Sequence, residues 1–257
     1  MPDLSDRVVV ITGASGGIGR VMARRYARCG ARVMLVARRP DELAITAEAI
    51  AGDGAEAAIH VADITDEAQC TEVIADAVRR WGRLDVLVNN AAIPGADQPV
   101  AEATIANWLD VLTTDLVAPM VLSREALRQA MIPAGSGNVQ FVSSSASRQV
   151  QPNKAHYASA KLALTALAQT LALEVGRQGI RVNTLVVGSV AGELFDTYIA
   201  RTARENDVDP GELRRRLSGL TKMGRLVQPD EVADVSVWLA SDESSAITGQ
   251  DIAVTGG

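Results

Sequence analysis

Short apolar runs alternate with longer amphipathic segments from one end of the chain to the other. The earliest runs are nearly continuous Val, Ile and Leu, which is typical of strands covered on both faces. The runs predict seven strands, at 8–12, 32–37, 57–61, 85–89, 139–143, 181–186 and 251–254. The segments between them predict helices near 18–29, 41–51, 66–81, 104–131, 155–178 and 229–240. This alternation predicts an α/β fold, a doubly wound sheet of parallel strands joined by right-handed crossovers.

Turn-forming residues support these boundaries. A left-handed C-cap is expected where glycine follows a helical pattern, at Gly30, Gly52, Gly82 and Gly179. Pro229 suits the first turn of the last long helix. Because no linker or repeat divides the chain, residues 1–257 are predicted to form a single domain. One long irregular segment at about 188–228 is polar and charged, and we expect it to cover the site as a mobile flap.

Composition and charge narrow the class of protein. The 257 residues are 47% apolar and 22% charged, so the chain can bury a large core. The net charge of −6 argues against nucleic-acid binding, which usually needs a basic face. The acidic N-terminus runs almost at once into a strand without a signal peptide, and no apolar run is long enough to span a membrane. We therefore expect a soluble, cytoplasmic protein with no membrane partner.

The cysteines and histidines give little sign of metal or disulfide chemistry. Cys29 and Cys70 form no CxxC spacing and fall in predicted helices, so we expect reduced structural thiols. The two histidines, His60 and His156, are far apart in the sequence, and no metal site is expected.

A glycine cluster follows the first predicted strand and opens the first helix. Glycines there let the backbone approach a pyrophosphate, and a helix N-terminus offers free N–H groups to it. A simple turn is the alternative, but the position directly after a buried strand favours a dinucleotide cradle. The candidate binding residues are Gly13, Ser15, Gly16, Gly17, Ile18 and Gly19.

The end of the second strand bears on the choice of cofactor. Enzymes that use NAD place Asp or Glu there to bind the ribose 2′-OH, whereas a nearby Arg favours the 2′-phosphate of NADP. Arg38 and Arg39 stand at this position, and Arg38 can pair with a phosphate. Both arginines facing water is the alternative. The sequence therefore favours NADP, with NAD as the second choice.

Two further strand ends fit a nucleotide lying across the sheet. Asp63, followed by Ile64, ends the third strand, and its carboxylate is a candidate acceptor for the adenine amino group. Asn89 and Ala91 belong to the Asn-Asn-Ala-Ala run after the fourth strand, whose small side chains leave room for backbone contact to a ribose. Taken alone, both could be ordinary strand caps.

Tyr157 and Lys161 are four residues apart at the start of a predicted helix, so both project from one face. A phenol has a pKa near about 10, and an adjacent ammonium lowers it toward the range of a useful general acid or base. Ser144 belongs to a serine triplet at the end of the fifth strand, where a hydroxyl can bind a substrate oxygen. Spacing alone leaves the choice among Ser143, Ser144 and Ser145 open.

Taken together these motifs resemble the short-chain dehydrogenase/reductase family, and in particular its 3-oxoacyl-carrier-protein reductase-like members. The resemblance runs from Arg7 to Gly257 and rests on TGASGGIG at 12–19, Asp63, NNAA at 89–92, Ser144 thirteen residues before Tyr157, YASAK at 157–161, RVN at 181–183 and the terminal Gly-Gly. It implies a Rossmann-like sheet of seven strands, selects Ser144 over its neighbours, and gives Lys161 a second role in binding the nicotinamide ribose. It also implies a homotetramer or a homodimer.

Several positions depart from the family pattern. Where the family usually has Asn in the long fourth helix, holding a water relay to the lysine, alignment of 108–116 places Asp115. We expect Asp115 to substitute for it, with a carboxylate that favours a charged lysine. The Pro-Gly after the sixth strand reads Val187-Gly188 and the following Thr is Gly192, which leaves the Val190 backbone as a candidate cofactor contact. The arginine that NADP users often carry in the glycine loop is Gly16 here.

The leading expectation is therefore an oxidoreductase that transfers a hydride between NADP(H) and a ketone or secondary alcohol, with Tyr157 as general acid and base. The alternatives are an NAD-dependent alcohol dehydrogenase of the same family and a non-catalytic dinucleotide-binding sensor. The substrate is a small molecule; a 3-oxoacyl thioester, a sugar-derived ketone, a terpenoid and a steroid-like alcohol all fit. Candidate pocket-wall residues are Ile93, Pro94, Arg148, Val150, His156, Val190, Leu194, Phe195 and Tyr198.

Overall fold

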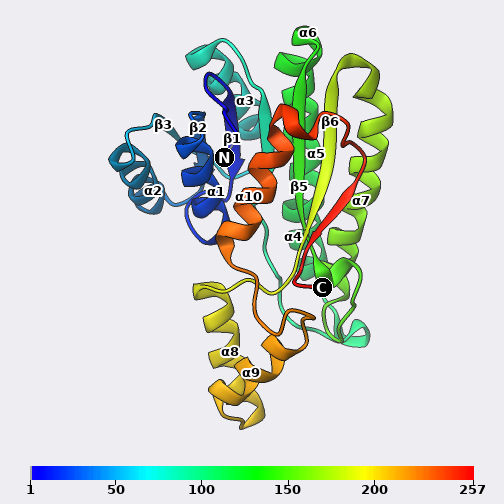
Figure 1. Ribbon diagram of the computed structural model, residues 1–257. Helices are drawn as coiled ribbons and strands as arrows, with labels where there is room; N and C mark the ends of the chain where they lie inside the picture. Colours follow the sequence, from blue (N-terminus) through cyan, green and yellow to red (C-terminus); the bar gives the residue numbers. More distant parts are fainter. Residues whose placement is uncertain (1) are drawn as a thin grey trace.

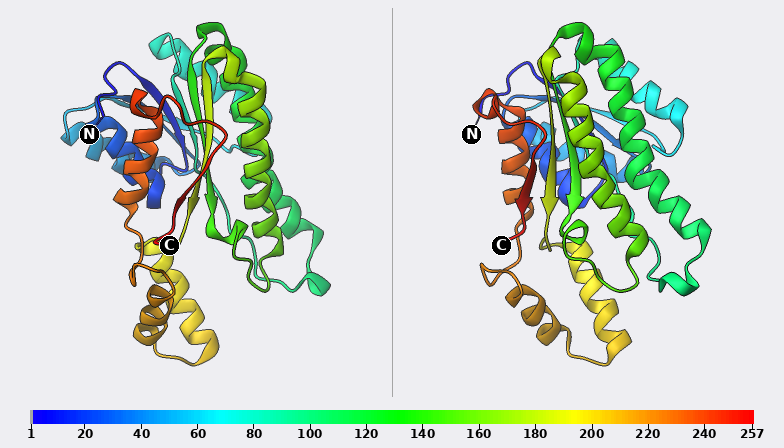
Figure 2. Two further views of the ribbon diagram at one scale, coloured as in Figure 1. Left: turned by 45° about the vertical axis from the view of Figure 1, so that its right-hand side comes forward. Right: turned by 90° about the vertical axis from the view of Figure 1, so that its right-hand side faces the viewer.

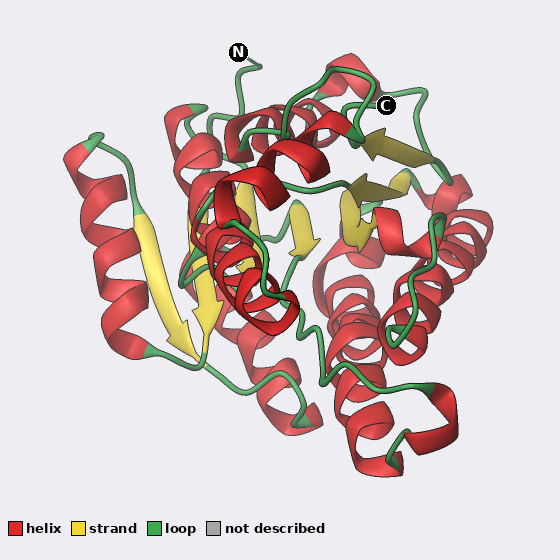
Figure 3. Ribbon diagram, turned by 90° about the horizontal axis from the view of Figure 1, so that it is seen from below, coloured by secondary structure: helices red, strands yellow, loops and turns green. Residues whose placement is uncertain are grey.

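A sheet of seven parallel strands runs through the computed structural model, which describes residues 2–257. The strands lie in the order β3-β2-β1-β4-β5-β6-β7 (Figure 1), and Figure 3 shows the sheet between its helices. Their bounds are β1 Val8–Thr12, β2 Arg32–Ala37, β3 Ala57–Val61, β4 Val86–Asn89, β5 Gly137–Ser144, β6 Ile180–Val187 and β7 Asp251–Val254. All seven predicted strands are present within one or two residues, and the predicted parallel α/β fold is confirmed.

The central strands are buried on both faces. Every residue of β1 is buried, and Val9 pairs with Val33 of β2 on one side and Val86 of β4 on the other. From β1 the chain builds β2 and β3 on one side of the sheet, and it then crosses to the other side to build β4 next to β1. The strand order therefore reverses between β1 and β4. Ligands of doubly wound sheets bind outside the carboxyl ends of the strands at such a switch point.

Helices cover both faces of the sheet (Figure 2). One layer contains α1 Gly17–Arg28, α2 Pro40–Gly52 and α10 Pro229–Ala240, which pack on one core cluster. The other contains α3 Glu67–Trp81, α5 Ala118–Ala126 and α7 Ala155–Val175, which pack on the second cluster. Short 3₁₀ turns lie at Val100–Glu102, Ser145–Ser147, Gly176–Gln178 and Asp242–Ser244.

The predicted helix over 104–131 is interrupted twice by π-helical turns. It begins as α4 Ile105–Leu112, passes through Thr113–Val117 into α5, and then through Leu127–Met131 into α6 Ile132–Ala134. By length and composition the whole 30-residue stretch Ile105–Ala134 could cross a membrane, contrary to the expectation that no such run exists. Helices of a protein core share this length and composition, and α5 packs here against α3 and β4.

The sequence predicted an irregular segment at 188–228, and this prediction was wrong. The segment carries two helices. They are α8 Glu193–Asn206 and α9 Pro210–Gly219, which lie beyond the carboxyl edge of the sheet (Figure 1). Phe195, Ile199 and Leu226 form a small core of their own between them. The predicted glycine C-caps have positive φ at Gly30, Gly82 and Gly179, whereas Gly52 lies within α2 and its expected role was wrong.

Both cysteines are free, buried thiols. Cys70 is fully buried and its Sγ donates to the carbonyl of Ile64 at 3.0 Å; burial raises the pKa of this thiol to about 12. Burial also raises the pKa of Cys29. Since the thiolate is the reactive form, both side chains are poor nucleophiles in the folded protein.

We therefore predict that Ellman's reagent labels neither cysteine rapidly in the native protein near about pH 8, where a free thiol is substantially ionised. Both cysteines are expected to react once the chain is unfolded in denaturant. Rapid labelling of one thiol without unfolding would contradict the prediction.

Candidate active site

The predicted site residues gather along one edge of the sheet. The glycine loop follows β1, Arg38 follows β2, Asp63 lies just beyond β3, and Ser144 ends β5. Because all strands are parallel, these ends lie at the same edge, and α7 brings Tyr157 and Lys161 to β5. One fold feature therefore places the dinucleotide residues and the catalytic candidates next to one another.

The glycine loop allows α1 to approach the end of β1 closely. A Cβ added at Gly19 would lie 2.3 Å from the carbonyl oxygen of Gly13 and 2.6 Å from Nδ2 of Asn90. Gly13 has φ of 68°, a conformation that favours glycine. The loop and the first turn of α1 thus pack backbone against backbone, and in the described part of the chain no side chain caps the helix N-terminus, whose N–H groups can bind a ligand.

The second amide of the Asn-Asn pair, which sequence reasoning passed over, ties β1 to β4. Asn90 Nδ2 donates to the carbonyl oxygen of Thr12 at 2.9 Å, and the backbone N–H groups of Asn90 and Ala91 both donate to Thr12 Oγ1 at 3.0 Å. The Asn89 side chain is instead buried and donates to Ser123 Oγ at 3.2 Å. The sequence showed two amides after this strand, but it did not show which of the two side chains contacts the glycine loop.

Two further polar side chains fix the glycine loop from the side of α1 and α2. Arg20 Nη2 donates to the Ser15 carbonyl at 2.6 Å, and Thr46 Oγ1 donates to the Ala14 carbonyl at 3.0 Å. Neither was expected from the sequence, because a lone Arg or Thr in a helix carries no motif. The loop is therefore held in shape before any ligand binds.

The two arginines after β2 differ in what they contact. Arg39 Nη2 donates to Ser15 Oγ at 3.3 Å, within the glycine loop. Arg38, the residue that the sequence favoured for a phosphate, lies 3.9 Å from Asp63 Oδ2 and is largely exposed. Hydrogen bonds from Thr65 hold the pKa of Asp63 below its ordinary value, so this carboxylate is ionised beside Arg38. Ile64 is buried in the core.

The catalytic lysine candidate is held by β5 at both ends. Ser143 Oγ donates to the backbone carbonyl of Lys161 at 2.8 Å, and Lys161 Nζ donates to the Val142 carbonyl at 3.2 Å. The Lys161 side chain is only 4% exposed, and its Nζ lies 5.5 Å from the centre of the Tyr157 ring. Ser143 is occupied in this way and is excluded, whereas Ser144 at the end of β5 stays a candidate for binding the substrate oxygen.

The Ser144 hydroxyl keeps its proton for another partner. Its Oγ accepts the backbone N–H of Ala146 at 3.2 Å as the 3₁₀ turn begins. The Ser147 hydroxyl donates to the Ser144 carbonyl at 2.6 Å and stabilises the same turn. A hydroxyl with one lone pair occupied can still donate to a substrate oxygen.

Asp115 contacts the lysine directly. It lies in the first π-helical turn, is fully buried, and its Oδ2 is 3.2 Å from Lys161 Nζ. Its Oδ1 accepts the backbone N–H of Ile93 at 2.8 Å. Burial raises the pKa of this carboxyl above its ordinary value, and the neighbouring ammonium limits the rise.

Some of the expected pocket-wall residues are packed inside the protein, and others are exposed at its surface. His156 is buried, with Nε2 3.0 Å from the Pro94 carbonyl and its ring edge-on to Trp108. Phe195 packs into the small core of α8 and α9, and Arg148 contacts Asp251. The remaining candidates include two strongly exposed apolar side chains, Val150 and Leu194.

Other contacts join the α8 segment to the rest of the molecule. Asp97, in the loop after β4, pairs with Lys154 just before α7 and with Arg201 of α8, the latter at 3.4 Å. Val190 forms a parallel bridge with Val227, which fixes the two ends of the 188–228 segment to each other.

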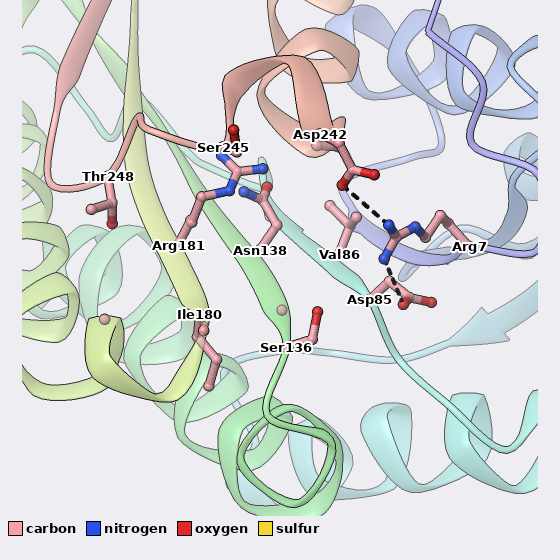
Figure 4. Close-up of a pocket in the computed structure, with 14 residues that line it drawn as sticks. Arg7, Asp85, Val86, Ser136, Asn138, Ile180, Arg181, Asp242, Ser245 and Thr248 are labelled. Atoms are coloured by element: carbon pink, nitrogen blue, oxygen red, sulfur yellow. Dashed lines mark hydrogen bonds and ion pairs between the residues drawn. The ribbon is translucent and has the colours of Figure 1, made fainter.

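A cavity of about 330 Å³ lies at the opposite edge of the sheet (Figure 4). Arg7 pairs there with Asp85 and Asp242, at 3.5 and 3.3 Å. Arg181 donates to the carbonyls of Leu239 and Ser241. Since these charges and donors already have protein partners at the amino ends of β4, β5 and β6, the cavity is structural and separate from the predicted site.

Comparison with known proteins fits this geometry. The family model described as enoyl-(acyl carrier protein) reductase matches residues 13–257. A Streptomyces violaceoruber protein named as a ketoacyl reductase of the granaticin polyketide synthase is 35% identical over 258 residues, covering 97% of this chain and 92% of its own length.

Solved structures agree over the whole chain. A variant of actinorhodin polyketide ketoreductase with NADPH has a TM-score of 0.94 at 31% identity, covering 100% of this chain and 98% of that one. NAD⁺-bound xylitol dehydrogenase has a TM-score of 0.93 at 29% identity, covering 98% and 99%. With the glycine loop, the strand-end serine and the Tyr-Lys pair in place, this chain belongs to the short-chain dehydrogenase/reductase family of oxidoreductases, which act on CH–OH and C=O groups.

Proposed function

We propose that this protein transfers a hydride between NADP(H) and a ketone or secondary alcohol, with Tyr157 as the acid and base. The observation that carries the proposal is the arrangement at β5. Lys161 is fixed beside the Tyr157 ring, and Ser144 ends the same strand with a hydroxyl proton free to donate. The tyrosine, the ammonium and the strand-end hydroxyl thus belong to β5 and the start of α7, which pack against each other at the carboxyl edge.

The residues at this edge fit a nicotinamide dinucleotide. The backbone packing of Gly13 and Gly19 leaves no room for a side chain in the loop, as a pyrophosphate cradle requires. The loop N–H groups would hold the phosphates, Asp63 the adenine side, and Lys161 the nicotinamide ribose. When bound, the cofactor supplies or accepts the hydride.

The chain's own side chains handle the proton and orient the substrate. The Ser144 hydroxyl donates to the substrate oxygen and fixes its position. In reduction Tyr157 donates its phenolic proton to that oxygen as negative charge develops there; in oxidation it removes the alcohol proton. The Lys161 ammonium stabilises the phenolate that reduction leaves behind.

A preference for NADP is supported by Arg39 more than by Arg38. Arg39 reaches Ser15 in the glycine loop, where a phosphate on the adenosine ribose would lie between a guanidinium and a hydroxyl. Arg38 is exposed and faces Asp63. NAD remains the alternative, because similar structures contain NADPH in one case and NAD⁺ in another.

We propose a cytoplasmic homotetramer or homodimer acting on a small-molecule carbonyl or alcohol. Apolar side chains that this chain leaves exposed on α4, α7 and the first π turn support self-association. They are Ile105, Leu109, Val117, Leu162 and Leu173.

Gly19→Ala tests the cradle. The added Cβ meets the Gly13 carbonyl at 2.3 Å, so α1 must move away from the loop, and NADPH affinity should fall by about tenfold or more. Gly52→Ala is the matched control, since its Cβ meets nothing within 4 Å. Fluorescence titration with NADPH measures both variants, and equal affinities for Gly19→Ala and wild type would refute the cradle.

Arg39→Ala tests the cofactor preference. Loss of a charge-assisted contact to phosphate should raise the KM for NADPH by about tenfold or more while leaving the KM for NADH nearly unchanged. Arg38→Ala should have a smaller effect, and Arg177→Ala, an exposed arginine before β6, none. An unchanged KM for NADPH in Arg39→Ala would overturn the assignment.

Tyr157→Phe tests the mechanism. The variant keeps the ring but has no proton to give, so kcat should fall by at least about a hundredfold, with NADPH binding and the unfolding temperature unchanged. A panel of cyclic ketones, sugar-derived ketones, 3-oxoacyl thioesters and their alcohols, followed at the nicotinamide absorbance, provides the turnover. Undiminished turnover by Tyr157→Phe would exclude this mechanism.

A further inference from the structure

A buried pair of opposite charges lies behind the tyrosine. Asp115 and Lys161 have side chains that are 0% and 4% exposed, with 3.2 Å between Oδ2 and Nζ. Asp115 Oδ1 accepts the Ile93 N–H, while Oδ2 pairs with the Lys161 ammonium by charge and accepts no hydrogen bond from the described residues. Burial raises the pKa of the Asp115 carboxyl, and the Lys161 ammonium and the Ile93 N–H oppose that rise by favouring the ionised form.

The backbone groups that bond the pair are neutral. The β5 strand presents the Val142 carbonyl to Lys161, and the loop after β4 presents the Ile93 N–H to Asp115. Two titratable groups of α7 act on the pair: the Tyr157 ring, whose centre is 5.5 Å from Lys161 Nζ, and His156, whose charge acts on Asp115. The His156 ring bonds the Pro94 carbonyl through Nε2. Asp115 is therefore the negative charge that opposes Lys161.

A carboxylate at this distance changes what the lysine does to the tyrosine. A lone buried ammonium strongly favours a phenolate beside it, whereas an ammonium paired at 3.2 Å acts as a short dipole whose field falls off more steeply. The family's usual amide at this position carries no charge and leaves the ammonium uncompensated. Asp115 is thus a positioning residue that acts on Tyr157 through Lys161.

We propose that Asp115 is a built-in counter-ion which keeps Tyr157 protonated to higher pH and so extends the pH range over which the protein works as a carbonyl reductase. The inference rests on the proposed function, in which the Tyr157 O–H bond breaks, a new O–H bond forms on the substrate oxygen, and the carbonyl carbon gains the hydride that the reduced nicotinamide loses. The phenolate left on Tyr157 then takes its proton back from solvent. Oxidation of the alcohol needs the phenolate at the start, and it is confined to higher pH.

The test is a spectroscopic titration that needs no substrate. The chain has only three tyrosines, so the near-ultraviolet absorbance of phenolate can be followed against pH, and the difference between a protein and its Tyr157→Phe counterpart isolates Tyr157. Asp115→Asn keeps an oxygen for the Ile93 N–H and removes the charge. Its Tyr157 transition should lie about one pH unit below that of wild type, because the ammonium is no longer opposed.

Controls separate charge from structure. Asp85→Asn removes a buried carboxylate at the far edge of the sheet, paired with Arg7 and Arg83, and should leave the Tyr157 transition in place. Asp115→Ser provides a second neutral variant if Asp115→Asn does not fold, and the same downward shift is expected. An unshifted transition in a folded neutral variant overturns the counter-ion role. If Tyr157→Phe is inactive at the same time, the proposed function stands without it; if Tyr157→Phe keeps its turnover, the function itself fails.

Discussion

The parallel direction of the seven strands determines where each functional side chain can lie. Parallel strands place their carboxyl ends and the N-termini of the following helices at one edge, and the reversal of order between β1 and β4 opens a position there for a ligand. The glycine loop and Asn90 border that position, and β5 supplies Ser144 next to it. The opposite edge carries Arg7, Asp85 and Arg181 in closed ion pairs and hydrogen bonds, and these stabilise the sheet without facing the reaction.

A second constraint follows from burying a lysine in this edge. An ammonium that is nearly inaccessible to water needs partners, since an unpaired buried charge is costly. β5 supplies a carbonyl, and Ser143 fixes the backbone from which the side chain extends. Asp115 supplies the charge, from a π-helical turn of the kind that is frequent at functional sites. The same contact that stabilises the buried ammonium is the one through which, in our proposal, Asp115 acts on Tyr157.

The strands were predictable to within one or two residues because central parallel strands are buried on both faces and appear as continuous apolar runs. The α8 and α9 helices were missed because they bury only a small core and are otherwise polar, although Asp209 before Pro210 was a helix-start signal. Sequence motifs predicted the candidate site residues, but they did not predict which side chains would form hydrogen bonds or ion pairs with them. Whether Arg38 or Arg39 reaches the loop depends on side-chain direction, which no spacing reveals.

The segment after β4 joins the two halves of the site. Asn90 holds the glycine loop through Thr12, and three residues later the Ile93 N–H holds Asp115, which contacts Lys161. The candidate dinucleotide cradle and the candidate catalytic lysine are therefore positioned from one short stretch of backbone. Hydride transfer requires the nicotinamide and the proton donor to meet the same carbonyl within a fraction of an ångström. In the proposed function a shared support favours this meeting, because a displacement of the segment would move the glycine loop and Lys161 in the same direction.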